Sequence, residues 1–207
     1  MKKIGIIDYG MGNLHSVENA FKYIGASCFI SDDKEELSRA GGLILPGVGA
    51  FPDASERLNA LDFPAFIKAE TEKKPLLGIC LGMQLLFEKS YEFRECAGLG
   101  YIKGSVVRLK AGENNKMYKI PHIGYNALET VNPSPLTKGI PDGSCFYFVH
   151  SYMGQCLDRS QLVSVTEYGE EVTAIVSSGN VYGTQFHPEK SGETGLKLLS
   201  NFVEILG

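Results

Sequence analysis

Through about residue 90, short apolar runs alternate with segments whose apolar side chains recur at helical spacing, and this alternation limits the possible folds more than any other feature. Alternating strands and helices are typical of βαβ units, which place the strands in one parallel sheet and the helices on its faces. Val17, Ala20, Phe21 and Ile24 illustrate the helical spacing. The expected strands are 3–8, 27–30, 42–45 (ended by Pro46) and 75–79, and the expected helices are 16–24, 32–37 and 61–71.

The second half of the chain changes character, because strand-like runs follow one another with only short turn clusters between them. Such a series indicates antiparallel strands added to the parallel core. The expected fold class is therefore α/β, with a mixed, largely parallel central sheet flanked by helices, antiparallel strands added in the second half, and one domain over 1–207. The strand-like runs are 105–109, 122–130, 145–150, 162–167, 172–177 and 181–186, and a closing helix presents Leu196, Leu199, Phe202, Val203 and Leu206.

Residues 78–84, GICLGMQ, join a buried strand to an apolar helix within two residues. Small neighbours let the backbone turn sharply and leave Cys80 exposed at the strand tip, as in a nucleophile elbow. The positive end of the following helix favours a thiolate at this position. Leu85 and Phe87 indicate the first turns of that helix. A buried structural cysteine is the alternative interpretation, because free cysteines are among the most buried residues.

A cysteine nucleophile needs a base, and the base needs a group that orients it. Of the four histidines, His187 stands in the stretch FHPE, where Pro188 disfavours helix and holds the turn stiff. Glu189, two residues on, has a carboxylate that can fix the tautomer of the imidazole. A surface His-Pro turn is the alternative, and His15, His122 and His150 have structural interpretations of their own.

The tetrahedral intermediate of acyl transfer requires aimed N–H donors. The backbone N–H of Leu81, at the helix start, is one candidate. The loop Pro46-Gly47-Val48-Gly49 supplies the second, because the glycines permit a backbone that turns a peptide N–H toward the substrate. A plain strand-ending turn is the alternative for this loop.

Composition excludes several classes of protein. The formal net charge of −4 and the absence of a Lys/Arg cluster argue against nucleic acid as the main partner. The five cysteines form no CxxC pair, so neither a disulfide framework nor a zinc site is indicated. No stretch suits a signal peptide or a membrane span, and we expect a reducing cytoplasm. The lone G-x-G at 10–12 is only a weak signal for a nucleotide.

Two of these motifs together, GICLGMQ at 78–84 and FHPE at 186–189, resemble those of the class I (triad) glutamine amidotransferases. The resemblance covers essentially the whole chain and implies the flavodoxin-like fold of that family. It also implies hydrolysis of glutamine to glutamate and ammonia. In this reaction Cys80 would form a glutamyl thioester, His187 would move the proton, and Glu189 would orient His187.

Further stretches resemble one group within this family. The loop PGVG at 46–49 and the stretches IDYGMGNLHS at 7–16, PHIGYN at 121–126 and YFVHSY at 147–152 are similar to the glutaminase subunits of imidazole glycerol phosphate synthase. The usual Pro-His-Met-Gly-Trp-Asn pattern is altered here, because Ile123 and Tyr125 replace Met and Trp.

Further residues take roles from the resemblance. Gln84, one helical turn beyond Cys80, points to the same side and can bind the carboxylate or amino end of the substrate. No metal or organic cofactor is expected, because thiol, imidazole and carboxylate suffice. The oxyanion would be held by Gly47, Val48, Gly49 and Leu81, and the substrate by Gly49, Gln84, Glu92, Ser151 and Tyr152.

The partner implied by the resemblance is a (β/α)8-barrel cyclase in a heterodimer. It would use the ammonia to make imidazole glycerol phosphate and aminoimidazole carboxamide ribotide in histidine biosynthesis. A paralogous glutaminase of a sugar amidination pathway, a cysteine peptidase or deglycase of related fold, and a non-catalytic binding module are the alternatives. The interface residues expected on this basis are Asn13, Tyr125, Asn126, Tyr147 and Lys190.

Overall fold

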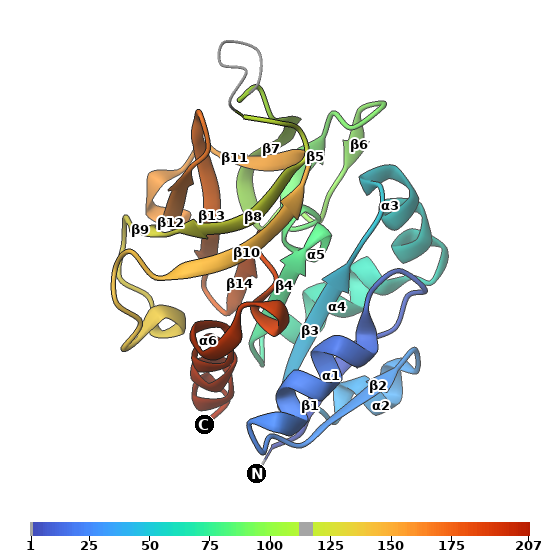
Figure 1. Ribbon diagram of the computed structural model, residues 1–207. Helices are drawn as coiled ribbons and strands as arrows, with labels where there is room; N and C mark the ends of the chain where they lie inside the picture. Colours follow the sequence, from blue (N-terminus) through green and yellow to red (C-terminus); the bar gives the residue numbers. More distant parts are fainter. Residues whose placement is uncertain (1, 112–117) are drawn as a thin grey trace.

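The computed structural model describes residues 2–111 and 118–207, and its centre is a sheet of eight strands (Figure 1). Neighbours from β2 to β14 pair in parallel, whereas β13, β12 and β9 continue the sheet in antiparallel fashion. This confirms the expected mixed, largely parallel sheet. In spatial order the strands are β2 (Cys28–Ser31), β1 (Ile4–Ile7), β3 (Gly42–Gly47), β4 (Leu76–Cys80), β14 (Val181–Thr184), β13 (Glu171–Ser178), β12 (Leu162–Glu167) and β9 (Glu129–Thr130).

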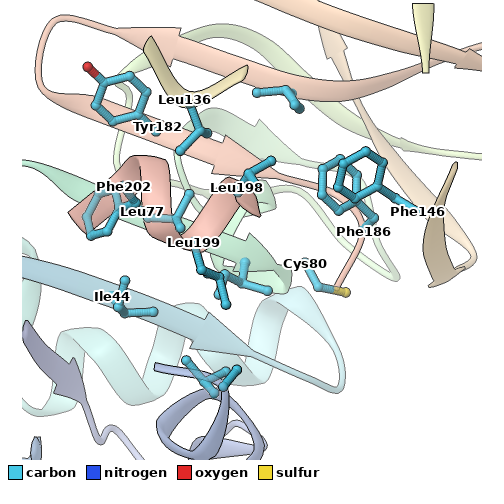
Figure 2. Packing of buried hydrophobic residues seen from close by; sticks show 14 of the residues in the cluster. Ile44, Leu77, Cys80, Leu136, Phe146, Tyr182, Phe186, Leu198, Leu199 and Phe202 are labelled. Atoms are coloured by element: carbon cyan, nitrogen blue, oxygen red, sulfur yellow. The ribbon is translucent and has the colours of Figure 1, made fainter. Parts of the chain in front are cut away.

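Helices cover both faces of this sheet. Side chains alternate along each strand, so Ile6 packs into one apolar cluster and Ile7 into the other. Figure 2 shows the first cluster, in which Leu198, Leu199 and Phe202 of the closing helix approach the sheet. The first face carries α1 (Leu14–Tyr23) and α6 (Gly192–Ile205), and the second carries α2 (Lys34–Ser38), α3 (Phe51–Ala60) and α4 (Phe63–Thr71).

Two smaller sheets lie beside the antiparallel part of the large one (Figure 1). Strand β8 (His122–Ala127) pairs antiparallel with β10 (Cys145–His150). The other sheet has the order β11 (Tyr152–Cys156), β7 (Ile102–Arg108), β5 (Phe87–Ser90) and β6 (Cys96–Ala97). The remaining elements are α5 (Leu81–Gln84) and the 3-10 turns η1 (Pro135–Thr137), η2 (Arg159–Gln161) and η3 (Pro188–Lys190).

Two expectations about the first half need correction. Pro46 does not end the third strand but lies inside β3, opposite Ile79, because its fixed φ is compatible with extended backbone. The helix expected at 61–71 is α4 alone, and α3 precedes it as a separate helix. Asp62, with φ 52°, divides the two helices.

The helix after the elbow is also shorter than expected. It ends at Gln84, and Phe87 begins β5 instead, where its buried ring packs against Gly154 of β11. The expected run 122–130 is two strands in different sheets, and β11 was not expected at all. In these places tertiary pairing overrides the local pattern.

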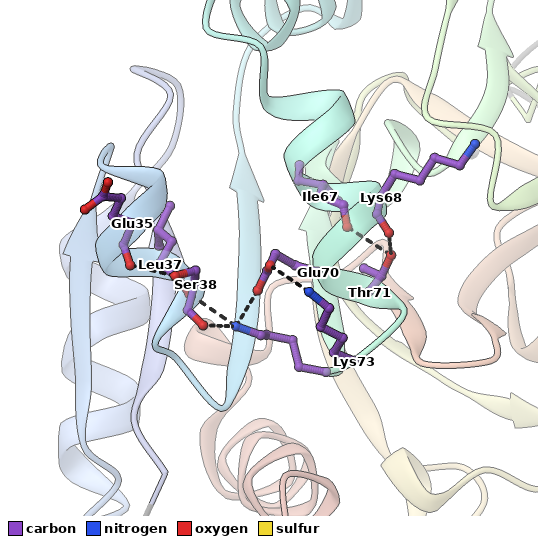
Figure 3. Close-up of polar contacts among 9 residues, drawn as sticks. Glu35, Leu37, Ser38, Ile67, Lys68, Glu70, Thr71 and Lys73 are labelled. Carbon is purple, nitrogen blue, oxygen red and sulfur yellow. Dashed lines mark hydrogen bonds and ion pairs between the residues drawn. The ribbon is translucent and has the colours of Figure 1, made fainter.

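A buried ion pair joins α2 to the end of α4. The Lys74 ammonium lies 2.6 Å from Glu70 Oε2 and donates to the backbone carbonyl of Ser38 at 2.6 Å. Figure 3 shows Glu70 facing Leu37 and Ser38 across this junction. The ammonium thus neutralises a buried carboxylate and satisfies the carboxyl end of α2. Among the described residues, no helix has both the length and the apolar character needed to cross a bilayer.

Candidate active site

Cys80 occupies a strained turn between β4 and α5. Its φ of 56° and ψ of −111° lie outside the ordinary regions for a residue with a side chain. The neighbouring glycines make the turn possible, since a Cβ on Gly82 would lie 1.8 Å from the carbonyl oxygen of Leu45. A Cβ on Gly78 would meet the Gly82 oxygen at 2.6 Å. The sequence therefore folds here as the expected elbow.

His187 and Glu189 form a buried pair at the end of the neighbouring strand β14. His187 Nδ1 lies 2.7 Å from Glu189 Oε1, and the two side chains are 5% and 1% exposed. Burial by itself lowers the pKa of His187. Hydrogen bonds and charge interactions with Cys80 and Glu189 outweigh burial and raise the pKa to about 10. His187 is therefore adapted to hold a proton between a thiol and a carboxylate.

Cys80 and His187 open into one cavity of about 350 Å³. Its volume falls in the range of small-ligand sites. Ten of the residues expected at the site line it: Val48, Gly49, Cys80, Leu81, Gln84, Glu92, Ser151, Tyr152, His187 and Lys190. Pro121, Val149 and His150 complete the wall.

Two glutamine side chains lead to the Cys80 thiol. The Gln84 amide nitrogen donates to the Tyr152 carbonyl at 2.8 Å and to Gln185 Oε1 at 3.0 Å. Gln185 Nε2 in turn donates to Cys80 Sγ at 3.8 Å. Both hydrogens of the Gln84 amide are thus committed, which leaves its oxygen, an acceptor, for a ligand. An acceptor suits the amino end of an amino acid rather than its carboxylate.

Glu92 has a structural contact besides its place in the cavity wall. Its Oε2 accepts from the backbone N–H of Phe51 at 2.7 Å, so it satisfies the first turn of α3. Burial raises the pKa of Glu92, although the Phe51 bond opposes that shift. Glu92 is therefore not a solvated surface carboxylate, because it is 8% exposed.

The glycine loop after β3 lies beside the elbow. Gly47 pairs with Cys80 across the sheet, and a Cβ there would lie 2.7 Å from the Tyr9 hydroxyl. Gly49 has φ 100°, which favours glycine. Val48 and Gly49 line the cavity, whereas Gly47 does not.

The five residues expected at an interface differ in exposure. Tyr125 is 60% exposed and donates to the Lys190 carbonyl at 2.9 Å. Tyr147 is half-buried, with its ring 5.5 Å from that of Tyr125. Asn13 and Lys190 are exposed, but both ends of the Asn126 amide bind inside the protein. A partner could therefore contact the side chains of four of these residues, whereas the Asn126 amide is already hydrogen-bonded within the protein.

The sequence predicted neither a role for Gln185 nor a place for His150 in the cavity wall. Gln185 follows the end of β14 and stands two residues before His187, in a bend whose side-chain directions the sequence does not predict. His150 carried no signal in the sequence either. Among residues 2–111 and 118–207, no group of three His, Cys, Asp or Glu side chains is arranged to hold a metal ion.

The chain matches one protein family and several named relatives over nearly its whole length. The family described as "Glutamine amidotransferase class-I" matches residues 5–206. The imidazole glycerol phosphate synthase subunit HisH of Bacillus cereus (strain G9842) is 52% identical over 204 residues, 98% of this chain and 95% of that protein. The HisH subunit of Caldanaerobacter subterraneus subsp. tengcongensis is also 52% identical, over 98% of each chain.

Solved structures share the fold at low sequence identity. The crystal structure of a glutamine amidotransferase has a TM-score of 0.75 at 20% identity, over 99% of this chain and 98% of that one. PurLQS from Thermotoga maritima gives 0.74 at 22% identity, over 100% of both chains. These similarities concern the fold alone.

Proposed function

Because this chain belongs to the class I glutamine amidotransferase family, we propose that it is the glutaminase subunit of an imidazole glycerol phosphate synthase. One observation carries the chemistry: Cys80, on a strained elbow, and the buried His187–Glu189 pair meet at the cavity. We take residues 1–207 as one amidotransferase domain acting in the cytoplasm.

In the proposed reaction, Cys80 Sγ attacks the side-chain amide carbon of glutamine. His187 holds the thiol proton and passes it to the departing ammonia, which leaves a glutamyl thioester. Water then attacks the thioester with His187 as base, and glutamate and the free thiol result. Glu189 fixes the tautomer of His187 and stabilises its positive charge.

Backbone donors would stabilise the tetrahedral oxyanion. The Leu81 N–H follows the nucleophile directly, as in other elbows. The second donor is a peptide N–H of the loop formed by Gly47, Val48 and Gly49. Two observations support this role: Val48 and Gly49 line the cavity, and Gly47 lies opposite Cys80.

The amino-acid end of glutamine would bind at the opposite wall. Its ammonium meets the Gln84 oxygen and the Glu92 carboxylate, which are acceptors at the cavity. Gly49, Ser151 and Tyr152 complete the subsite. This arrangement refines the broader expectation for Gln84, because its committed hydrogens favour the amino end over the carboxylate.

The ammonia needs an acceptor enzyme, and we propose a (β/α)8-barrel cyclase. The relatives are named as subunits of a synthase, which implies a complex. Large side chains are exposed here: Val48, in the cavity wall, is 44% exposed, Tyr125, bonded to the cavity residue Lys190, is 60% exposed, and Ile123, two residues before Tyr125, is 57% exposed. Exposed apolar patches of this kind mark protein interfaces. Asn13, Tyr147 and Lys190 would lie at the rim.

Reconstitution tests this function. The chain is mixed with a histidine-pathway cyclase and its ribotide substrate, and glutamine-dependent formation of imidazole glycerol phosphate is followed. Co-elution of the two proteins and dependence on glutamine are expected. Product formation from ammonium salts but not from glutamine would contradict the proposal.

A further inference from the structure

A continuous series of hydrogen bonds links strand β8 to the nucleophile. At one end, the Asn126 amide nitrogen donates to the Glu167 carbonyl at 3.0 Å. At the other, Gln84 and Gln185 lead to the Cys80 thiol. Two buried imidazoles lie between. Their contacts are Asn126 Oδ1 to His122 Nε2 at 2.9 Å, His122 Nδ1 to His150 Nε2 at 3.1 Å, and His150 Nδ1 to Tyr152 O at 2.9 Å.

The part between the carbonyls of Tyr152 and Glu167 needs one hydrogen more than its neutral groups hold. A carbonyl only accepts, so His150 Nδ1 donates at one end and the Asn126 nitrogen at the other. The Asn126 oxygen then faces His122 Nε2, which must also donate. Each neutral imidazole has a single N–H, and both are now used. The 3.1 Å contact between the two rings is left with two lone pairs.

No rearrangement of neutral groups removes this defect. Turning over the Asn126 amide would give His122 a donor at Nε2 and free its Nδ1–H for His150. The Asn126 oxygen would then face the Glu167 carbonyl, so the missing hydrogen moves along the series without being supplied. An acceptor facing an acceptor in a buried site costs about as much as a lost hydrogen bond.

We propose that His122 and His150 share one additional proton, and that this pair is a positioning element of the glutaminase site. With three protons on four ring nitrogens, every contact from Glu167 to Tyr152 contains a hydrogen. The positioning role rests on the proposed function, whereas the number of protons on the two rings does not depend on it.

The surroundings of the pair have opposing effects on its affinity for a proton. Burial lowers the pKa of His122, and burial together with charge repulsion from His122 and His187 lowers the pKa of His150 to about 3, so these effects oppose a shared proton. Among the described residues, histidine ion pairs involve only His15 and His187, so no carboxylate offsets the charge. The His122 ring is instead stacked between Tyr168, with centroids 3.8 Å apart, and Phe148, at 4.8 Å. Aromatic faces attract a cation, and the shared hydrogen bond adds to that attraction.

The pair acts on the nucleophile through one carbonyl. Tyr152 O accepts from both His150 and Gln84, so the imidazole helps to hold the carbonyl that the Gln84 nitrogen binds. The Gln185 oxygen therefore faces Gln84, and its nitrogen faces Cys80. The shared proton thus acts on the two amides indirectly, because it fixes the His150 ring that holds the Tyr152 carbonyl.

Nitrogen-15 NMR of histidine-labelled wild-type chain counts the protons directly. Protonated and unprotonated ring nitrogens have well-separated shifts, and the chain has only four histidines to assign. We expect three protonated nitrogens out of four in the His122–His150 pair at pH 7. Two would overturn the proposal. The measurement needs no glutaminase activity, so it remains decisive even if the proposed function fails.

Variants at His122 test the positioning role by kcat/KM for glutamine in the complex with the cyclase. His122→Leu removes the contact to His150 and should lower kcat/KM about tenfold. His122→Asn can place its amide nitrogen near the former Nδ1 and donate to His150 without an extra proton, so it should restore most of the rate. In wild type, rising pH removes the shared proton and should lower the rate. The rate of His122→Asn should not show this loss.

The exposed His15→Asn is the matched control and should leave both rate and pH profile unchanged. Coincident pH profiles of wild type and His122→Asn would overturn the positioning role. A chain that hydrolyses no glutamine in any form would instead contradict the proposed function, while the NMR count would still decide on the shared proton.

Discussion

His187 Nδ1 lies 2.7 Å from Oε1 of Glu189, and both side chains are almost wholly removed from solvent. The second carboxylate oxygen, Oε2, is buried without a hydrogen-bond partner among the described residues. The whole attraction of this carboxylate is therefore directed at one imidazole. Together with the Cys80 thiol, this contact accounts for the raised pKa of His187.

Replacing Cys80 by alanine should abolish glutamine hydrolysis, because no other cysteine lies on such a turn. The backbone strain at position 80 should fall little, so the fold and binding of the cyclase should persist. A glutaminase assay with circular dichroism checks this. Cys145→Ala, at an exposed cysteine, is the control and should remain fully active. Retained hydrolysis in Cys80→Ala would refute the triad.

Glu189→Gln should lower the pKa of His187, because it removes a negative charge that raises this pKa to about 10. A raised pKa means that protonated His187 stabilises the fold at lower pH and that this contribution disappears as pH rises through about 10. The alkaline limb of kcat/KM against pH should therefore shift to lower pH in the variant. An unshifted limb would contradict the role of Glu189.

The same two positions should differ in the size of their effects. Glu189→Gln loses orientation and charge stabilisation, whereas His187→Asn loses proton transfer itself, so kcat should fall further in the second. Steady-state kinetics of both variants, measured with the cyclase, provides the comparison. Equal or reversed losses in kcat would count against these assignments.

Tyr9→Phe should stabilise the protein. The Tyr9 hydroxyl is buried and has no hydrogen-bond partner among the described residues. Removing an unsatisfied polar group recovers its desolvation cost, so the free energy of unfolding in urea should rise by about 1–2 kcal/mol. The matched control is Tyr101→Phe, whose hydroxyl lies 3.0 Å from Thr71 Oγ1, and there a loss of about 1 kcal/mol is expected. Destabilisation of Tyr9→Phe would indicate a bound water or a polar partner.

Lys74→Met should destabilise the protein strongly. It leaves Glu70, 11% exposed, without the ammonium at 2.6 Å, and stranding one member of a buried ion pair costs about 3–5 kcal/mol. Urea denaturation measures the loss. Lys73→Met removes an exposed lysine 4.0 Å from the same carboxylate and should cost below about 1 kcal/mol. Similar losses in the two variants would show that burial of Lys74 is not the cause.

Sequence reasoning succeeded where one local pattern decides the structure. The strands Cys145–His150 and Leu162–Glu167 begin and end where the sequence predicts, because turn residues bound them. The elbow was predictable in part for the same reason, since Gly78 is required by contacts with Gly82 and Met83 in the same turn, whereas Gly82 is required by Leu45 of the neighbouring strand.

The misses have a different origin. Phe87 fits the period of the preceding helix, but the pairing of β5 with β7 draws it into a strand. The bond between Gln84 and Gln185 joins residues 101 positions apart, and that between His122 and His150 joins residues 28 apart. Spacing within one segment carries no information about such contacts. That Cys80, His187 and Glu189 lie together could be predicted because they belong to two motifs, whereas the hydrogen bonds of Gln84, Gln185, His122 and His150 form only in the tertiary structure.

The last prediction concerns the glycine loop after β3. We expect the isolated chain to hydrolyse glutamine poorly, and the cyclase holding its ribotide to raise the rate by about 10²–10³-fold, the worth of one oxyanion donor. A peptide beside Gly47 or Gly49 can present either its N–H or its C=O to the cavity at small cost, and Gly49 already has φ 100°. If the resting loop presents the carbonyl, one oxyanion donor is missing.

The partner must then bind the active orientation more tightly, since a ligand with equal affinity for both states shifts nothing. Val48 lies at the cavity and is 44% exposed, so a docked cyclase can contact this loop directly. Steady-state glutaminase kinetics of the chain alone, with cyclase, and with cyclase plus ribotide measures the effect. A fully active isolated chain would refute control by the loop and leave the triad intact, because the triad needs no partner to assemble.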